Sequence, residues 1–583
     1  MQRSAEVIII GSGVGGLAAA KTYLELSPQT DLVLLEKRPT LGGVWAEENC
    51  YEGLKTNNLL GTYEFTDFPM DTTTYGVREG EHIPGFVLHK YFNDFADHFD
   101  LRRRIRFNTT VLEVEKVDGG WKILVTETAQ QQEETQVIYT CDKLIISSGL
   151  ASNANPISIP GKEDFGRPVL NHSELRDRAA ALAEDPNVKS VTVVGASKTG
   201  YDAVFLMAAH GKKVEWVIRE SGGGAVWMAE PWVDLGGLKV RLEHMATMRF
   251  FSWFSPCTWG NADGFGWIRS ALHRTRLGRF LVNQFWEKIR SDVIETNGYR
   301  REEALKHLEP DESLFWSARV GVLNYASDIH EYLRTGQVTI TKRDISHLSA
   351  PGTVHFADET TLQTDALIAI TGWNLAPTIK YKPDGLDAHL GLPSRTLTPE
   401  QESLWEKLDS MADTSIMTQF PTLAHPPKTT IPYKQSVTPF RLYRGISPPS
   451  LTSESDPSLA CMKMVHSTSN MIIAETQALW IYAYMNGKLD IDREAVYRET
   501  ALASRFGKHR YPCGFSAWYP EFVYDAIPYA DLLLKDLGLK GWRKPSMLRE
   551  VFEGYTIHDY RGLNREWRER AMGREVVVGK KVL

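Results

Sequence analysis

The sequence predicts an α/β fold in which one nucleotide-binding domain is inserted into another, with a mostly helical insertion in addition. Two segments carry this prediction. VIIIGSGVGGLAAAKTYLE at 7–25 and SVTVVGASKTGYDAV at 190–204 each join an aliphatic run, a glycine turn and a run with small residues. The aliphatic run is typical of a buried parallel strand, and strand, glycine turn and helix together begin a Rossmann-like domain.

The first glycine turn has the residues that a dinucleotide diphosphate requires. Gly11 allows the tight turn, Gly13 lets the backbone approach the diphosphate, and Gly16 lets the helix pack on the strand. The helix N-terminus adds unpaired N–H groups and a positive partial charge. The next strand, DLVLLE, ends at Glu36, where a carboxylate meets a free ribose 2′-hydroxyl, so FAD or NAD is expected rather than NADP.

A second glycine pair favours FAD. Gly42 and Gly43 in LGGVW resemble the second glycine pair of FAD-dependent oxidoreductases that have two dinucleotide domains. Simple NAD dehydrogenases have no need of glycines at this point. The FAD contacts expected in this part of the chain are Gly11, Gly13, Gly15, Gly16, Glu36, Lys37, Gly43, Val44 and Trp45.

The second glycine turn predicts an NADPH site. Its middle glycine is replaced by Ser197, but a strand and a helix still flank it, and the following strand ends at Arg219. A positive residue there suits a 2′-phosphate, and Lys198 adds to the same field. The alternative is a structural repeat whose Arg219 lies in solvent. The expected NADPH contacts are Gly195, Ser197, Lys198, Thr199 and Arg219.

A third segment, TDALIAITGW at 364–373, resembles the motif that returns the chain to the first domain in such proteins, with Thr371 and Gly372 at the crossing. DKLIISSG at 142–149 is its earlier counterpart. The predicted organisation is an FAD-binding domain at 1–165 and 364–490, an NADPH-binding domain at 166–230 and 331–363, a helical insertion and possible substrate cap at 231–330, and a helical C-terminal extension at 491–583.

Two further segments resemble the flavin-containing monooxygenases, which are class B flavoprotein monooxygenases. YEGLKTNNLLGTYEFTDFPM at 51–70 matches the family pattern Y-x-x-L-x-T-N followed by F-x-D-F-P, and AETQALW at 474–480 resembles its E-x-Q-x-x-W segment. The resemblance implies FAD contacts from Thr56, Asn57, Asp67 and Gln477. The insertion and the C-terminal extension look like those of fungal members, which implies specialised metabolism.

The resemblance also implies the chemistry. NADPH reduces FAD, the reduced flavin forms a C4a-(hydro)peroxide with O2, and one oxygen atom passes to a small lipophilic substrate. Asn57 is the first candidate for holding the peroxide, because its amide both donates and accepts hydrogen bonds. Asn58 is its possible substitute. Arg219 would serve the alternative reaction, a Baeyer–Villiger oxidation of a ketone, in which an arginine stabilises a negative peroxide. A non-redox rearrangement enzyme or a scaffold that holds FAD is the remaining alternative.

The composition excludes several other classes. The 583 residues are enough for two or three domains, and a net charge of −7 gives no general attraction to nucleic acid. Five scattered cysteines without a CxxC argue against a disulfide reductase, and the sequence predicts no metal site. No segment reaches the ~18 apolar residues of a membrane span. We therefore expect a cytoplasmic enzyme whose partners are a small molecule and O2, with the oligomeric state left open.

Overall fold

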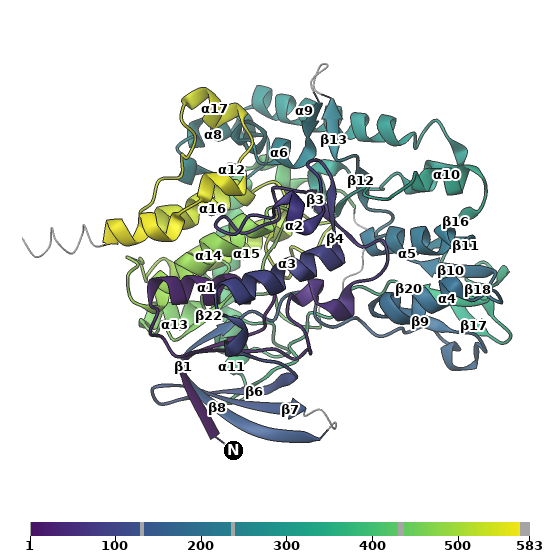
Figure 1. Cartoon of the computed structure of the whole chain (residues 1–583). Helices are drawn as coiled ribbons and strands as arrows, with labels where there is room; N and C mark the ends of the chain where they lie inside the picture. The colour runs from purple at the N-terminus through teal and green to yellow at the C-terminus, as the bar shows by residue number, and fades with distance from the viewer. Residues whose placement is uncertain (1, 129–132, 235–238, 429–435, 572–583) are drawn as a thin grey trace, which may run out of the picture.

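The computed structural model describes residues 2–128, 133–234, 239–428 and 436–571. Two separate sheets form its two nucleotide-binding domains, as the two glycine turns predicted: the first is a mixed sheet and the second is all parallel. Figure 1 shows the first sheet at the lower end of the molecule and the second sheet at the right, with the insertion and the C-terminal helices above them. Residues 572–583 of the predicted C-terminal extension lie outside the described residues.

The first sheet has the order β21-β6-β7-β8-β1-β2-β5, with β22 added to β8. Strand β1 lies between β2 and β8 and pairs in parallel with both. Its residues Val7 to Ile10 are all buried, which explains the uninterrupted aliphatic run. The strands are β1 (Gln2–Ile10), β2 (Leu32–Leu35), β5 (Ile105–Arg106), β6 (Thr109–Val117), β7 (Gly120–Thr128), β8 (Glu134–Ile146), β21 (Lys380–Lys382) and β22 (Leu459–Cys461).

The second sheet has the order β16-β11-β10-β20-β9, and all its pairs are parallel. The position of strand β20 in this sheet shows that one predicted domain boundary is wrong. We expected 364–373 to open the second part of the first domain, but β20 lies between β10 and β9 with all four residues buried. The chain returns to the first sheet only at β21. The strands are β9 (Val169–Asn171), β10 (Ser190–Val194), β11 (Lys213–Ile218), β16 (Val338–Lys342) and β20 (Ala366–Ala369).

Helices cover the sheets and join the domains. In the first domain α1 packs along α14, where the rings of Tyr23 and Tyr482 meet edge to face at 5.0 Å. Helix α5 follows the second glycine turn, and β17, β18 and β19 form a three-stranded antiparallel sheet before β20. The bounds are α1 (Val14–Leu26), α3 (Gly85–His98), α5 (Lys198–Ala209), α12 (Pro399–Gln419), α14 (Asn470–Met485), β17 (Ile345–Ser349), β18 (Thr353–Phe356) and β19 (Thr361–Gln363).

The insertion is mostly helical, as predicted, and the C-terminal extension packs against it. Arg249 of the insertion is fully buried, and its guanidinium donates to Asp531 and Glu550 of the extension. The extension also packs on the first domain, because Tyr560, Leu563 and Trp567 are buried in the core of that domain. The helices are α6 (Leu242–Ala246), α7 (Arg249–Trp253), α8 (Gly266–Arg274), α9 (Arg276–Asn297), α15 (Val496–Arg510), α16 (Ala526–Asp536) and α17 (Met547–Phe552).

Among the helices of the described residues, none combines the length and apolar character that crossing a membrane requires. The same residues contain no group of three or more histidine, cysteine or acidic side chains that could hold a metal ion.

Candidate active site

The first glycine turn is too tight for side chains. Gly11 has a φ of +100°, and a Cβ atom there would lie 2.4 Å from the carbonyl oxygen of Ser147. A Cβ atom on Gly16 would lie 2.0 Å from the carbonyl oxygen of Gly11, so only glycine lets α1 pack this closely. No side chain among the described residues caps α1, and its first turn has no acidic residue. Its N–H groups are thus available for a phosphate.

The two glycine pairs of the first domain meet at this turn. Gly13 and Gly42 form an isolated parallel bridge, and a Cβ atom on Gly43 would lie 3.1 Å from the Cα atom of Gly13. Gly15 is equally confined, since a Cβ atom on it would lie 2.7 Å from the Ser147 hydroxyl oxygen. Backbone therefore forms the floor of the site, which lets a diphosphate approach closely.

Glu36 lies beside the turn, as the sequence predicted, and is 5% exposed. Its Oε2 accepts hydrogen bonds from the Ser12 N–H and hydroxyl, both at 2.8 Å, and its Oε1 accepts one from the Arg38 N–H at 3.0 Å. An ionised carboxylate has about four lone-pair sites, so it keeps acceptor capacity for ribose hydroxyls. Ser12, which the sequence analysis did not single out, fixes this carboxylate in place.

A positive group that the sequence did not reveal lies next to the same turn. Lys463 follows β22 with a φ of +59°, and a Cβ atom on Gly15 would lie 3.0 Å from its Cγ. Its Nζ donates to Asn470 Oδ1 at 2.7 Å, and burial lowers the pKa of Lys463 to about 7. Within the described ranges no carboxylate forms an ion pair with it. A partly buried cation without a counter-ion among the described residues, beside an uncapped helix N-terminus, favours an anionic ligand.

Two residues predicted to contact the cofactor are bound to other parts of the protein. Gln477 is fully buried; its Oε1 accepts the Lys463 N–H at 2.9 Å, and its Nε2 donates to the Tyr529 hydroxyl at 2.7 Å. Both ends of this amide are used, so Gln477 orients Lys463. Asp67 forms an ion pair with Lys21 of α1, which anchors the segment 51–70 on that helix.

The second glycine turn repeats the geometry of the first. Gly195 has a φ of +109°, and a Cβ atom on Gly200 would lie 2.3 Å from its carbonyl oxygen. Ser197 is the N-cap residue of α5 without a side-chain capping bond, and Thr199 stands in the first turn. Arg219 follows β11 and is exposed. Its side chain has no ion pair with any residue in the described part of the chain, so its charge is available to a ligand.

Lys198 differs from Arg219 because the protein itself neutralises its charge. Its Nζ donates to Asp202 Oδ1, lies 3.2 Å from the Tyr325 hydroxyl and stands over the Tyr325 ring. Asp202 also accepts hydrogen bonds from the hydroxyls of Tyr51 and Tyr325, both at 2.8 Å. We expected Lys198 to add to the field around a phosphate; the structure places it in a closed cluster that joins the two domains and the insertion.

The segment that carries the family resemblance forms β3 (Lys55–Leu59), which pairs with β4 (His82–Pro84). Thr56 is buried, and its hydroxyl donates to the Asn58 carbonyl at 2.6 Å and accepts the Ile83 N–H at 3.1 Å. Asn57 points the opposite way, is exposed, and forms no side-chain hydrogen bond with the residues that the structure describes. Its amide is therefore available to a ligand.

Asn58 is held by the insertion. Its Nδ2 donates to Glu243 Oε2 at 3.0 Å and to the Thr468 carbonyl at 3.3 Å. Burial raises the pKa of Glu243, which also accepts a hydrogen bond from Thr62 at 2.8 Å. The predicted substitute for Asn57 thus has a positioning role, and no sequence signal pointed to Glu243, because its partners are nearly two hundred residues away.

The remaining predicted residues surround these turns. Trp45 Nε1 donates to the Tyr63 hydroxyl at 3.0 Å, Val44 is 49% exposed, and Lys37 Nζ lies 3.3 Å from the Ser152 carbonyl. At the crossing between the domains the Thr371 hydroxyl donates to the Asn155 carbonyl at 2.6 Å, and Gly372 has a φ of +73°.

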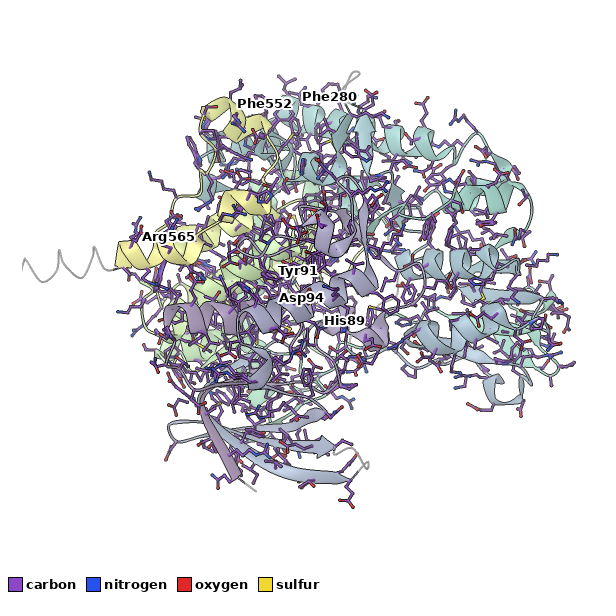
Figure 2. All side chains as sticks on the ribbon, in the orientation of Figure 1. His89, Tyr91, Asp94, Phe280, Phe552 and Arg565 are labelled. Carbon is purple, nitrogen blue, oxygen red and sulfur yellow. The ribbon has the colours of Figure 1, made fainter. Side chains whose placement is uncertain are left out.

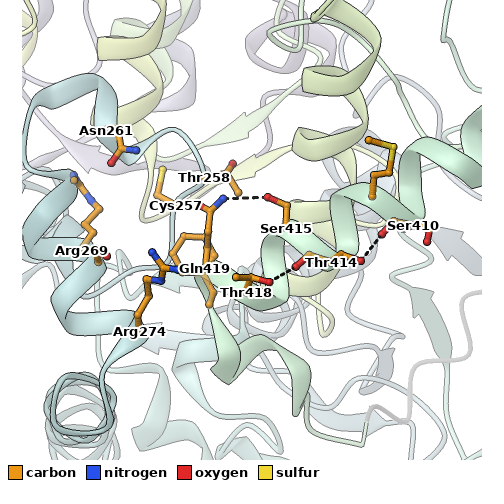
Figure 3. A pocket seen from close by; sticks show the side chains of 14 residues that line it. Cys257, Thr258, Asn261, Arg269, Arg274, Ser410, Thr414, Ser415, Thr418 and Gln419 are labelled. Carbon is orange, nitrogen blue, oxygen red and sulfur yellow. Dashed lines mark hydrogen bonds between the residues drawn. The ribbon is translucent and has the colours of Figure 1, made fainter.

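A cavity of about 790 Å³ lies between the insertion and α12 (Figure 3). Hydroxyl and amide side chains of α12 line one wall, and Arg269 and Arg274 of α8 stand on the other. Its wall includes Thr258, whose neighbour Trp259 packs against Phe522 and Tyr529. The insertion therefore forms one wall of this cavity, and packed aromatic rings connect it to Tyr529, which hydrogen-bonds Gln477 beside Lys463.

Comparison with known proteins agrees with this geometry. A family model described as pyridine nucleotide-disulphide oxidoreductase matches residues 5–223, which contain both glycine turns. The match does not extend to disulfide chemistry, since all five cysteines are buried and unpaired.

Relatives match over nearly the whole chain. The FAD-dependent monooxygenase rstn6 of Aspergillus nomiae is 32% identical over 96% of this chain and 98% of its own length. The FAD-dependent monooxygenase resA of Aspergillus sclerotiorum is 31% identical over 98% and 99%. The solved cyclohexanone monooxygenase from Rhodococcus sp. Phi1, bound to NADP+, has the same fold with a TM-score of 0.58 at 16% identity, covering 92% of this chain and 98% of that one. The chain is thus a flavin oxidoreductase and belongs to the FAD-dependent monooxygenases, within the class B flavin monooxygenases that its motifs resemble.

Proposed function

We propose that this enzyme uses FAD and NADPH to insert one oxygen atom from O2 into a small lipophilic organic molecule, in the cytoplasm and in specialised metabolism. The observation that carries the proposal is the difference between two similar glycine turns. The first lies beside the carboxylate of Glu36, which suits a bare ribose. The strand after the second is followed by the exposed Arg219, which has no ion pair with the described residues and suits a ribose 2′-phosphate. The cytoplasmic location and the place in specialised metabolism rest on the sequence alone.

The residues of the first turn fit FAD. Gly11, Gly13 and Gly43 have no side chains, so a ligand can approach the backbone closely. Helix α1 offers N–H groups, and Lys463 supplies a positive charge. Bound there, FAD supplies the hydride acceptance and O2 activation that the side chains lack. The protein's part is to bind it, to exclude water and to present Asn57 as a neutral hydrogen-bonding group.

The NADPH assignment is tested by Arg219→Ala. Loss of one charge-assisted hydrogen bond costs about 1.5–3 kcal/mol, so the KM for NADPH should rise roughly 10- to 100-fold. The KM for NADH, which lacks the 2′-phosphate, should hardly change. Arg103→Ala removes an exposed arginine of the first domain and serves as the matched control. Equal effects on both nucleotides would contradict the assignment.

The role of Asn57 is tested by its alanine variant. Because its amide has no hydrogen bond to the described residues, Asn57→Ala should keep its fold, its FAD content and anaerobic reduction by NADPH. Oxygen transfer to substrate should fall, with the consumed NADPH recovered as hydrogen peroxide. Full product yield would show that another group does this work.

Two alternatives are separated by product and redox measurements. A Baeyer–Villiger oxidation has some support because cyclohexanone monooxygenase shares the fold, and labelled O2 would then appear as a new ring or chain oxygen in an ester or lactone. A non-redox enzyme or scaffold would stay yellow when NADPH is added without oxygen, even with candidate substrates present.

A further inference from the structure

The insertion and the C-terminal extension carry large apolar side chains in solvent. On α9, Leu277, Phe280 and Leu281 are 69%, 58% and 45% exposed and lie on one face, at spacings of three and four residues. The opposite face of α9 already packs in the core through Val282 and Trp286. A surface helix normally keeps its outer face polar, so this second apolar face needs an explanation.

Neighbouring elements also carry large exposed apolar side chains. Trp267 of α8 is 73% exposed, and Leu548 and Phe552 of α17 are 70% and 52% exposed. Figure 2 shows Phe280 and Phe552 at the same end of the molecule, opposite the first sheet. We call this surface the apolar end; its members are Trp267, Leu277, Phe280, Leu281, Met547, Leu548 and Phe552.

Packed rings connect the two halves of the apolar end. The ring of Phe552 lies 5.3 Å from that of Phe250 in α7, and Phe250 lies 5.4 Å from Phe254. Phe254 stacks on Phe285 of α9 at 4.1 Å. Helices α17 and α9 are thus held on one shared aromatic cluster, and exposed apolar area of this kind typically marks an interaction site.

The charge around the apolar end is positive, although the whole chain carries −7. No acidic residue occurs from 264 to 286, whereas this stretch contains four arginines. Arg269 pairs with the buried Asp263, but Arg274, Arg276 and Arg279 have no ion pair with any residue that the structure describes. Arg274 and Arg276 are exposed. Exposed Trp, Leu and Phe together with free arginines have the composition of a surface that lies on a membrane.

We propose that the apolar end docks peripherally on a membrane surface that contains anionic phospholipid. A second copy of the chain fits less well, because a two-fold contact would bring the arginines of both copies face to face. A membrane accepts the apolar side chains among its acyl chains and the arginines among its phosphate groups. Arg274 also lines the 790 Å³ cavity, so docking places that cavity beside the membrane.

The test is co-sedimentation of the FAD-loaded full chain with vesicles of phosphatidylcholine alone and with phosphatidylserine added. The expected result is binding to the anionic vesicles that weakens when the salt concentration is raised. Phe280→Ser combined with Leu281→Ser should weaken binding at least tenfold, because it removes two large apolar side chains whose burial favours binding. Arg274→Glu combined with Arg276→Glu should remove the preference for anionic vesicles. Leu404→Ser, on α12 and 42% exposed in the wild type, is the matched control and should bind normally.

Retained FAD and an unchanged circular dichroism spectrum show that each variant is folded. Wild-type protein that stays in the supernatant with anionic vesicles would overturn the proposal, as would equal binding by the Phe280/Leu281 double variant. A dimer that forms with rising concentration in the absence of lipid, and that the same double variant loses, would also overturn the proposal. The apolar end would then be a contact between two copies of the chain.

Discussion

Replacing Lys463 with methionine tests whether the positive charge of this side chain contributes to FAD binding. Lys463 has a depressed pKa of about 7 without a bound anion, because burial disfavours its charge and no carboxylate of the described residues compensates. The FAD diphosphate would favour the charged form and raise this pKa again. Binding FAD above pH 7 must therefore take up a proton, and the affinity must fall as the pH rises.

The size of the effect follows from this linkage. Above the pKa of the free site and below that of the occupied site, the Kd for FAD rises by up to tenfold per pH unit, so from pH 7.5 to 9 it rises roughly 20-fold. Lys463→Met lacks the titrating group and should bind with a Kd that hardly changes over this range. At pH 6.5, where the lysine is charged, the variant should bind about 10- to 100-fold more weakly, as expected for a lost charge-assisted hydrogen bond.

The measurement is a titration of deflavinated protein with FAD at several pH values, followed by the quenching of flavin fluorescence. Lys463→Arg is the matched control, because a guanidinium stays charged throughout and should give a tight Kd without the pH dependence. If wild type and Lys463→Met showed the same slope with pH, the titrating group would be another one and Lys463 would not face the diphosphate.

Two further substitutions test the geometry of the turn and of the core. Gly43→Ala should abolish FAD retention, because its Cβ atom would lie 3.1 Å from the first glycine turn, whereas Gly53→Ala, with a similar positive φ and open space around it, should keep FAD at a small cost in stability. FAD content after gel filtration distinguishes the two, and equal retention would contradict the steric argument. Arg249→Met should lower the free energy of unfolding by about 3–5 kcal/mol, because it leaves Asp531 buried without its partner. Arg300→Ala breaks an exposed ion pair and should cost at most about 1 kcal/mol in the same urea titration, so similar losses would refute this reasoning.

Much of the fold was predictable because its signals are local. The aliphatic runs at Val7 and Val191, the glycine turns after them and Glu36 at the end of its strand lie within short windows of sequence. The predicted return to the first domain began too early in the chain. Strand β20 is followed by the crossing motif, but it pairs with β10 and β9 of the second sheet. An aliphatic strand does not reveal which sheet it joins.

The roles of charged and amide side chains were less predictable, because partners distant in the chain decide them. Lys198 and Arg219 look equivalent in sequence, yet Asp202 neutralises the first, whereas the second has no ion pair within the described ranges. Asn57 and Asn58 are adjacent, but side chains alternate along a strand. Asn57 therefore points outward, whereas Asn58 donates a hydrogen bond to Glu243.

The sequence by itself determined the two nucleotide-binding units, their order and the difference between a carboxylate and an arginine at their second strands, since glycine turns and buried strands are specified by neighbouring residues. Only the tertiary structure decided that Lys463 stands beside the first turn, that Gln477 supports it and that the insertion and α12 line a shared cavity. The physical reason is that burial and counter-charges arise from segments that meet only when the chain has folded.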